Sequence, residues 1–239
     1  MITAVAVPGL PEIGEGDDLA ALLAPHVQPG DVLVLAHKIV SKAEGRVRRL
    51  ADIEPTERAR ELGGALQKDP RQVQAVLDES AEILRTERVL ICQTHHGFVC
   101  ANAGVDASNA PDGTVVLLPE DPDASARRIR ASLPPRPAVV IADSFGRAWR
   151  IGQVDVAIGV AGLAPVEDWR GRRDATGREL TATVIAVADE AAAAADLARA
   201  GKLAGEPAVV VRGLDRFVTE DDGPGAQALL RVRSEDLFR

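Results

Sequence analysis

Three side chains that could bind a metal ion or a polar ligand lie close together in the stretch from Cys100 to Asn109, Cys-Ala-Asn-Ala-Gly-Val-Asp-Ala-Ser-Asn. Asp106, Ser108 and Asn109 supply oxygen and amide groups, and Gly104 allows the sharp turn that such a loop requires. The stretch is too polar for a buried core, yet apolar runs flank it on both sides. The pattern predicts a binding loop between two strands, although an Asx-rich surface turn would have a similar composition.

A second strand end carries the same kind of polar cluster. The apolar run Ala138–Ala142 leads directly into Asp143-Ser-Phe-Gly-Arg-Ala-Trp-Arg150. A carboxylate beside a hydroxyl suits Mg²⁺ or Mn²⁺, which take oxygen ligands, and an arginine can bind two phosphate or carboxylate oxygens at once. The alternative is structural, because Asp143 could form an ion pair with Arg147 or Arg150.

A third polar segment follows the apolar run Asp31–Val40 and reads Lys38-Ile-Val-Ser-Lys-Ala-Glu-Gly-Arg46. Lys38 and Lys42 stand on either side of a small hydroxyl, and a glycine follows them. The two lysines could bind phosphate oxygens, and they could equally be solvated charges at the end of a strand.

Zinc binding and covalent catalysis have less support. Cys92 and Cys100 lack a C-x-x-C spacing, which favours neither a zinc site nor a disulfide framework. His95 and His96 are adjacent, so their side chains point in different directions, and no H-E-x-x-H pattern accompanies them. No Ser-His-Asp or Cys-His set is recognisable. Two acidic loops with Lys, Arg and Ser nearby therefore favour metal-assisted phosphate chemistry.

Composition indicates an acidic globular protein. The 239 residues include 46% hydrophobic and 27% charged residues, and the formal net charge is −8. The hydrophobic share is ample for a core, and the scattered basic residues argue against nucleic acid as a main partner. The sequence has neither a signal-peptide pattern nor an apolar run of about 18 residues, so we expect a cytoplasmic protein without membrane contact.

The remaining pattern alternates apolar strands with helices, without a repeat or a flexible linker, so we expect one interwoven domain over residues 1–239. An exposed hairpin or loop is predicted at 169–179, and a short helix in the tail. Strands are predicted at 2–7, 31–40, 88–92, 114–118, 138–142, 181–187 and 208–211. Helices are predicted at 19–27 with a cap at Asp17 or Asp18, at 56–85 with an interruption at Asp69-Pro70, at about 123–133 with a cap at Asp123 or Ser125, and at 189–200.

Together these motifs resemble the coenzyme F-420-0:L-glutamate ligase family, also called gamma-glutamyl ligases. The resemblance extends over nearly the whole chain. Its ordered matches are Gly9-Leu-Pro-Glu12, Lys38-Ile-Val-Ser-Lys-Ala-Glu-Gly45, Ala101-Asn-Ala-Gly-Val-Asp-Ala-Ser-Asn109, Leu118-Pro-Glu-Asp-Pro-Asp-Ala-Ser-Ala126, Asp143-Ser-Phe-Gly-Arg-Ala-Trp-Arg150 and Ala188-Asp-Glu190.

The resemblance implies a GTP-dependent enzyme that joins L-glutamate to the lactyl phosphate side chain of a deazaflavin coenzyme precursor, and then adds further glutamates through gamma-linked amides. In such a ligase the acceptor carboxylate attacks the γ-phosphate to give an acyl phosphate and GDP, and the amine of glutamate then displaces phosphate. It also implies an α+β fold of mixed sheets with packed helices and interwoven halves, paired into an intertwined homodimer.

Carried over by motif, Asp106 and Asp143 would hold one divalent ion, Mg²⁺ or Mn²⁺, and Ser144 a second. We add Lys38 to the nucleotide site and Arg147 to the catalytic residues Asp106 and Asp143, on charge and position alone. The preferred divalent metal and a need for K⁺ are left open. The residues expected to line GTP are Leu10, Pro11, Glu12, Ile13, His37, Lys42 and Asn109.

Two departures from the family pattern bear on these expectations. His37 stands where part of the family has a small polar residue, and the chain ends soon after Asp236-Leu-Phe238, without the flavin-binding reductase domain that is fused in some relatives. We therefore expect ligation only. The alternatives are a ligase for another acceptor or amino acid, and a nucleotide- or metal-binding regulatory homologue without turnover. The intact Asp106, Asp143 and Ser144 argue against the second alternative.

Overall fold

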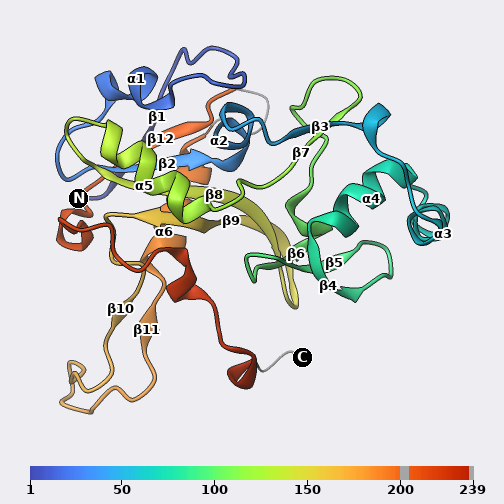
Figure 1. The fold of residues 1–239 in the computed structure, drawn as a ribbon. Coiled ribbons are helices and arrows are strands. Elements are labelled where there is room, and N and C mark those ends of the chain that lie inside the picture. Colours follow the sequence, from blue (N-terminus) through green and yellow to red (C-terminus); the bar gives the residue numbers. More distant parts are fainter. Residues whose placement is uncertain (200–204, 237–239) are drawn as a thin grey trace.

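A mixed five-stranded sheet lies at the centre of the computed structural model, which describes residues 1–199 and 205–236 (Figure 1). The strand order is β1-β12-β2-β8-β9, in which β2 and β8 are parallel and the other neighbours are antiparallel. Strand β1, near the N-terminus, pairs with β12, near the C-terminal end, as expected of interwoven halves. The strands are β1 (Thr3–Ala6), β2 (Val32–Ala36), β8 (Ala138–Arg147), β9 (Arg150–Ala161) and β12 (Ala208–Arg212).

Helices cover both faces of this sheet, which explains why its inner strands are continuous apolar runs. Alternate residues of β2 point to opposite faces. Leu33 and Leu35 pack with α1 (Leu19–Leu23) and α5 (Pro122–Ser132) on one face. On the other face, the alternate valines of β2 pack against the alanines of α6 (Val187–Ala198). The predicted α+β class is therefore confirmed.

A smaller lobe beside the central sheet contains a third buried apolar cluster (Figure 1). It combines two helices, a three-stranded antiparallel sheet and the ladder formed by β3 and β7. The lobe therefore has a core of its own. Its elements are α3 (Glu57–Leu66), α4 (Pro70–Asp78), β3 (Val47–Arg49), β4 (Ser80–Arg85), β5 (Ile91–Thr94), β6 (Val99–Ala101) and β7 (Thr114–Val116).

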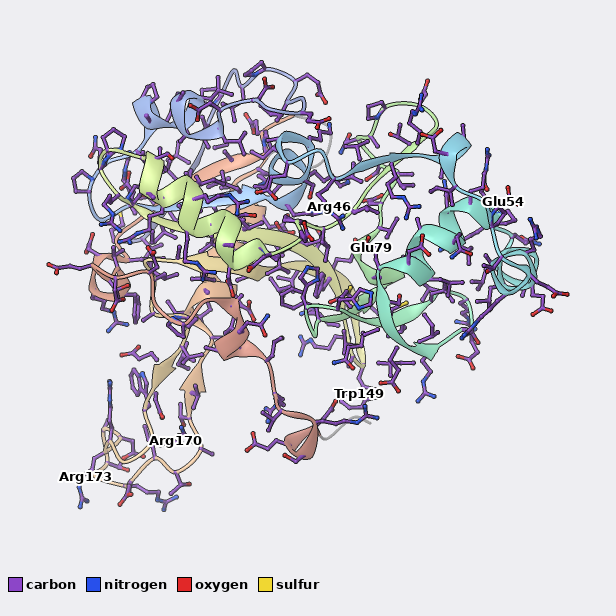
Figure 2. The ribbon with its side chains drawn as sticks, in the orientation of Figure 1. Arg46, Glu54, Glu79, Trp149, Arg170 and Arg173 are labelled. Carbon is purple, nitrogen blue, oxygen red and sulfur yellow. The ribbon has the colours of Figure 1, made fainter. Side chains whose placement is uncertain are left out.

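The remaining elements are short. A two-stranded hairpin carries the loop predicted at 169–179 and extends away from the central sheet, with Arg170 and Arg173 near its tip (Figure 2). No helix in the described part of the chain is long and apolar enough to cross a bilayer. The hairpin strands are β10 (Glu167–Asp168) and β11 (Val184–Ile185), the further helix is α2 (His37–Ala43), and 3₁₀ turns occupy Ala24–His26, Leu50–Asp52, Asn102–Gly104, Asp215–Phe217, Ala226–Leu229 and Arg233–Glu235.

Several predicted boundaries are wrong because long-range pairing decides them. The helix predicted to Arg85 ends at Asp78, since residues 80–85 pair with β5 as strand β4. The strand predicted to Val40 ends at Ala36, and α2 begins at the polar residue His37. The predicted strand 88–92 begins only at Ile91, that at 181–187 shortens to β11, and the unassigned segment after 153 belongs to β9.

Helix caps follow the sequence signals in part. Asp18 caps α1 and Pro70 opens α4, as predicted. The cap of α5 is Asp121 and not Asp123 or Ser125, because the helix already begins at Pro122. The last long helix, predicted at 189–200, instead begins at Val187 and ends at Ala198, because Arg199 already has extended backbone. Residue Ala200, most of the link that follows it and the final residues of the tail lie outside the described residues.

Replacement of Arg130 should destabilise the fold. This buried arginine of α5 donates to Asp222 Oδ1 (2.7 Å) and to the carbonyls of Thr219 (2.7 Å) and Pro137 (3.2 Å), so it fixes the C-terminal segment. We expect Arg130→Met to lower the free energy of unfolding by about 3 kcal/mol in denaturant titrations. Arg127→Met, at a half-exposed position of the same helix with only a 4.0 Å ion pair to Asp121, should change it by less than about 0.5 kcal/mol. Equal losses would contradict this role.

Candidate functional site

A cavity of about 850 Å³ opens where β2 ends and beside the middle of β8. Strand β8 does not end at Ala142 as predicted but continues to Arg147, because residues 143–147 pair with β9. The parallel register pairs Ala36 with Ala142, so the residues that follow them, His37 and Asp143, emerge side by side. Ligands of open α/β sheets bind at such carboxyl ends of strands. With one exception, Arg147, the cavity wall includes every residue that the sequence assigned to the site: Leu10, Pro11, Glu12, Ile13, His37, Lys38, Lys42, Asp106, Asn109, Asp143 and Ser144.

His37 is buried at the floor of the cavity. Its Nε2 lies 3.4 Å from Asp143 Oδ1, and its Nδ1 lies 3.4 Å from the hydroxyl of Ser41 one turn along α2. Burial lowers the pKa of His37 below its ordinary value, and the Asp143 carboxylate offsets this only in part. The imidazole is therefore neutral at pH 7. In the tautomer with the proton on Nε2 it orients the Asp143 carboxylate without adding a positive charge.

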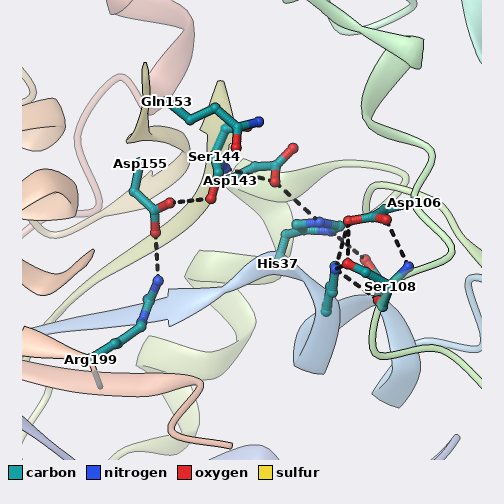
Figure 3. Close-up of polar contacts among 10 residues, drawn as sticks. His37, Asp106, Ser108, Asp143, Ser144, Gln153, Asp155 and Arg199 are labelled. Carbon is teal, nitrogen blue, oxygen red and sulfur yellow. Dashed lines mark hydrogen bonds and ion pairs between the residues drawn. The ribbon is translucent and has the colours of Figure 1, made fainter. Parts of the chain in front are cut away.

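Asp106 is held by hydrogen bonds from Lys38, in the first turn of α2, and from Ser108. Figure 3 shows Asp106 beside Ser108. Lys38 Nζ donates to Asp106 Oδ2 (2.7 Å) and to the Ser108 hydroxyl (2.7 Å), while the Ser108 amide donates to Asp106 Oδ1 (2.7 Å). Burial raises the pKa of Asp106, but the hydrogen bonds from Lys38 and Ser108 and the charge of Lys38 outweigh it and bring the pKa to about 2. The carboxylate is therefore ionised.

The turn that delivers Asp106 depends on Gly104, as the sequence predicted. Its φ is +73°, a conformation that residues with a Cβ rarely adopt, and a Cβ there would lie 2.6 Å from Leu118. The following residue, Val105, is buried in the core of the smaller lobe. Backbone hydrogen bonds in both directions then join Asp106 to Val116 of β7. Asp106 therefore reaches the cavity from the smaller lobe, whereas Asp143 comes from the central sheet.

Lys42 supplies a second ammonium to the cavity wall, and unlike Lys38 it is buried. Only 9% of this residue is exposed, and its Nζ is paired with Glu12 Oε1 on the loop that precedes α1. The Glu12 side chain is itself largely exposed. The pair therefore links α2 to the loop that carries Leu10 and Ile13. An anionic ligand in the cavity could replace the exposed Glu12 carboxylate at the Lys42 ammonium.

Sequence reasoning missed Asp155 and Arg199. The pairing of β8 with β9 places Asp155 opposite Ser144, whose hydroxyl donates to Asp155 Oδ1 (2.6 Å) (Figure 3). Asp155 Oδ2 accepts from Arg199 Nη1, and Asp155 is buried. The only local signal in the sequence for Asp155 was the presence of a single acidic residue within the apolar part of β9. Its partner follows an alanine-rich helix 44 residues later, so spacing could not connect them.

The carboxylate and hydroxyl oxygens of the cavity could supply part of the coordination of a divalent ion, and a bound molecule would supply the rest. No group of three or more His, Cys, Asp or Glu side chains that could hold a metal is found in residues 1–199 and 205–236. Asp106, Asp143 and Ser144 nevertheless offer hard oxygens, and Mg²⁺ is commonly bound by one or two carboxylates, water and substrate phosphates. A cation on Asp106 Oδ2 would compete with Lys38, which already occupies that oxygen.

Arg147 lies away from these groups. It is exposed at the turn between β8 and β9, and its Nη2 donates to the carbonyl of Ile151 (2.7 Å). Arg150 is exposed at the same turn. Cys100 does line the cavity, but burial raises the pKa of its thiol to about 12, and the charge of Asp143 adds to the effect. A protonated thiol is a poor nucleophile, which disfavours covalent catalysis by Cys100.

The fold and the cavity define an α+β protein whose acidic and basic side chains could bind a charged ligand together with a cation. The sequence profile of the F420-0:Gamma-glutamyl ligase family matches residues 9–213. The chain therefore belongs to that family, as its motifs predicted.

Relatives of known name match along the whole chain. The chain is 44% identical to the Coenzyme F420:L-glutamate ligase of Methanothermobacter thermautotrophicus, with 100% of this chain and 99% of the relative covered. It is 45% identical to the protein of that name from Archaeoglobus fulgidus (98% and 94% covered). It is 47% identical to that from Natronomonas pharaonis (99% and 94% covered).

Removal of the Lys38 ammonium should raise the pKa of Asp106. In Lys38→Met the carboxylate loses its main hydrogen bond and a positive charge, while the opposing effect of burial persists. We expect the pKa to rise from about 2 toward its ordinary 3.8 in a carboxyl ¹³C NMR titration, because the hydrogen bonds from Ser108 that also lower it remain. Asp168, whose pKa is held at about 2 by Arg170 on the distant hairpin, provides the internal control and should not change. An unshifted Asp106 would exclude Lys38 as the cause.

Proposed function

We propose that the protein is a GTP-dependent ligase that adds L-glutamate to the coenzyme F-420 precursor F-420-0 and extends the product by gamma-linked glutamates. Membership of the family and the names of the relatives support ligation of L-glutamate to this coenzyme. The observation that carries the proposal is the convergence of residues from five separate segments, at 10–13, 37–42, 106–109, 143–144 and 155, on one cavity.

The lysine side of the cavity suits the phosphates of GTP. Lys42 is buried, but its partner Glu12 is exposed, and such an ion pair contributes little stability in water. A phosphate can therefore replace the carboxylate at the Lys42 ammonium with little loss. Leu10, Pro11 and Ile13 would line the guanosine side, and Lys38 and Asn109, which also line the cavity, would contact the nucleotide as well.

Asp106 and Asp143 would hold one divalent ion, Mg²⁺ or Mn²⁺, and Ser144 a second. Such ions, when bound, neutralise the charge that develops on a transferring phosphoryl group. The chain contributes an ionised Asp106 and an Asp143 oriented by neutral His37. Because His37 carries no charge, it does not compete electrostatically with a cation at Asp143. K⁺ is a further candidate cofactor, and a ligation reaction from which K⁺ is omitted tests whether it is needed.

The reaction that fits this arrangement has two steps. An oxygen of the acceptor carboxylate forms a bond to the γ-phosphorus while the bond from phosphorus to the bridging oxygen breaks, which gives an acyl phosphate and GDP. The amine of L-glutamate then attacks the acyl carbon, an amide forms, and phosphate leaves with the electrons of the broken carbon–oxygen bond. The side chains of the cavity bind and orient the reactants, and the buried setting strengthens their electrostatic interactions.

We also propose that the protein is a homodimer, which the family resemblance supports. We propose further that it is cytoplasmic, which the two free thiols support. Cys92 and Cys100 are reduced and buried. Cysteines in this state suit the reducing conditions of the cytoplasm. The proposed partners are GTP, L-glutamate and the deazaflavin precursor, and neither nucleic acid nor a membrane.

Incubation of the protein with F-420-0, GTP, L-glutamate and Mn²⁺ should increase the mass of the precursor by whole glutamyl units. Mass spectrometry of the product measures this increase, and parallel reactions omit GTP, replace Mn²⁺ by Mg²⁺ or omit K⁺. We expect no product without GTP. An unchanged precursor, under conditions in which GTP and a divalent ion still bind, would contradict the assignment of the acceptor and favour a ligase for another carboxylate.

Asp143→Asn should reduce turnover by roughly 100-fold or more, because it removes a carboxylate charge from the proposed metal site while it preserves side-chain size. Rates with saturating GTP, glutamate and precursor measure the effect, and circular dichroism confirms the fold. The matched control is Asp174→Asn, which changes a carboxylate in the exposed 169–179 loop. Comparable turnover in the two variants would remove Asp143 from the reaction.

A further inference from the structure

Arg199 has a position that the proposed site residues do not explain. It follows the last residue of α6, lines the cavity, and has only 11% of its side chain exposed. One corner of the guanidinium, Nη1, donates to Asp155 Oδ2. The other oxygen of Asp155 accepts from Ser144, so the carboxylate is fixed on both sides and fixes Arg199 in turn (Figure 3).

The opposite edge of the Arg199 guanidinium is unused. Nε and Nη2 are both buried, and neither has a hydrogen-bond partner among the residues that the structure describes. These two atoms form the side edge of the guanidinium, which presents two parallel N–H groups. Buried donors are nearly always paired, because an unpaired donor loses its hydration without compensation. Both atoms are shielded from solvent, so a ligand with two oxygens that enters the cavity lined by Arg199 would pair with them only after the covering groups move aside.

A carboxylate matches this edge best. Two parallel N–H donors and a planar pair of carboxylate oxygens form a bidentate, charge-assisted pair. Asp155 already takes the Nη1 corner, so it both neutralises part of the charge and sets the plane of the guanidinium. Asp155 therefore acts as a positioning residue for Arg199.

The location of Arg199 indicates which reactant it meets. In Figure 3, Asp143 and Ser144 lie between Arg199 on one side and Asp106 with Ser108 on the other. Of the two lysines that suit phosphate, Lys38 contacts Asp106 and Lys42 contacts Glu12 in the 10–13 loop. Arg199 thus lies on the opposite side of Asp143 and Ser144 from Asp106, away from the group assigned to phosphate there, and is available to a second reactant.

We infer that the Nε–Nη2 edge of Arg199 is a carboxylate subsite for the incoming amino acid. The identity of that amino acid as L-glutamate rests on the proposed function. Both carboxylates of glutamate are spectators when its amine attacks, so a firm clamp on one of them orients the amine without cost to its reactivity. The single carboxylate of the first acceptor, by contrast, must attack phosphorus, and pairing with a guanidinium would weaken it as a nucleophile.

The test is the first glutamate addition catalysed by Arg199→Gln. We expect the KM for L-glutamate to rise about tenfold or more, as for the loss of a charge-assisted hydrogen bond, while the KM values for GTP and precursor stay within about twofold. Arg199→Lys keeps a charge but not the fork and should give an intermediate KM. Arg173→Gln, in the exposed hairpin, is the matched control and should behave as wild type.

A second variant guards against misfolding. Arg199→Gln leaves Asp155 buried and without its cation, so the double variant Asp155→Asn/Arg199→Gln removes both charges together. It should show the same selective increase in the KM for glutamate, with an unfolding midpoint closer to that of wild type. An unchanged KM for glutamate in either folded variant would overturn the inference. So would an increase confined to GTP or to the precursor.

Direct binding separates this inference from the proposed function. Saturation-transfer NMR with L-glutamate, on wild type and Arg199→Gln without nucleotide, reports the subsite whether or not ligation occurs. A signal that is present in wild type and lost in the variant supports the subsite even if the precursor is never extended. Equal signals from the two proteins would overturn the subsite and leave the ligase proposal untouched.

Discussion

The arrangement of the site depends on the parallel pairing of β2 with β8. That register ends at Ala36 and Ala142, and the next residues, His37 at the start of α2 and Asp143 within β8, both line the cavity. A shift by one residue would turn the apolar side chains of β2 from one face of the sheet to the other, so the two covering helix layers enforce the register. Core packing on both faces therefore sets the distance between the imidazole and the carboxylate.

A common electrostatic pattern runs through the cavity. Each of its cations already has a carboxylate partner: Lys38 with Asp106, Lys42 with Glu12, and Arg199 with Asp155. Pairing of this kind keeps buried charges from standing alone, which would be costly in a low-dielectric interior. The pairs differ in exposure, and the most exposed carboxylate, that of Glu12, is the one that a competing anion can displace most readily. The buried Asp155 remains a fixed support.

Local signals in the sequence were enough to find the main polar loops and the family. Asp143 directly follows an apolar run, Asp106 lies in a polar loop between two such runs, and Gly104 marks the turn, so these features needed no knowledge of tertiary contacts. Asp155 could not be found in this way, because its role comes from the pairing of β9 with Ser144 and from a helix far along the chain. For the same reason residues 80–85 carry a helical spacing of apolar side chains but form a strand against β5.

The delivery of Asp106 and Asp143 from different parts of the molecule has a thermodynamic consequence. Asp106 is tied to the smaller lobe with its own core, whereas Asp143 extends from the central sheet. Any molecule that touches both carboxylates, or an ion between them, acts as a noncovalent cross-link between lobe and sheet. Ligand binding then stabilises the association of the smaller lobe with the central sheet by mass action. The substrate concentration therefore helps to determine how long the protein resists heat and proteolysis.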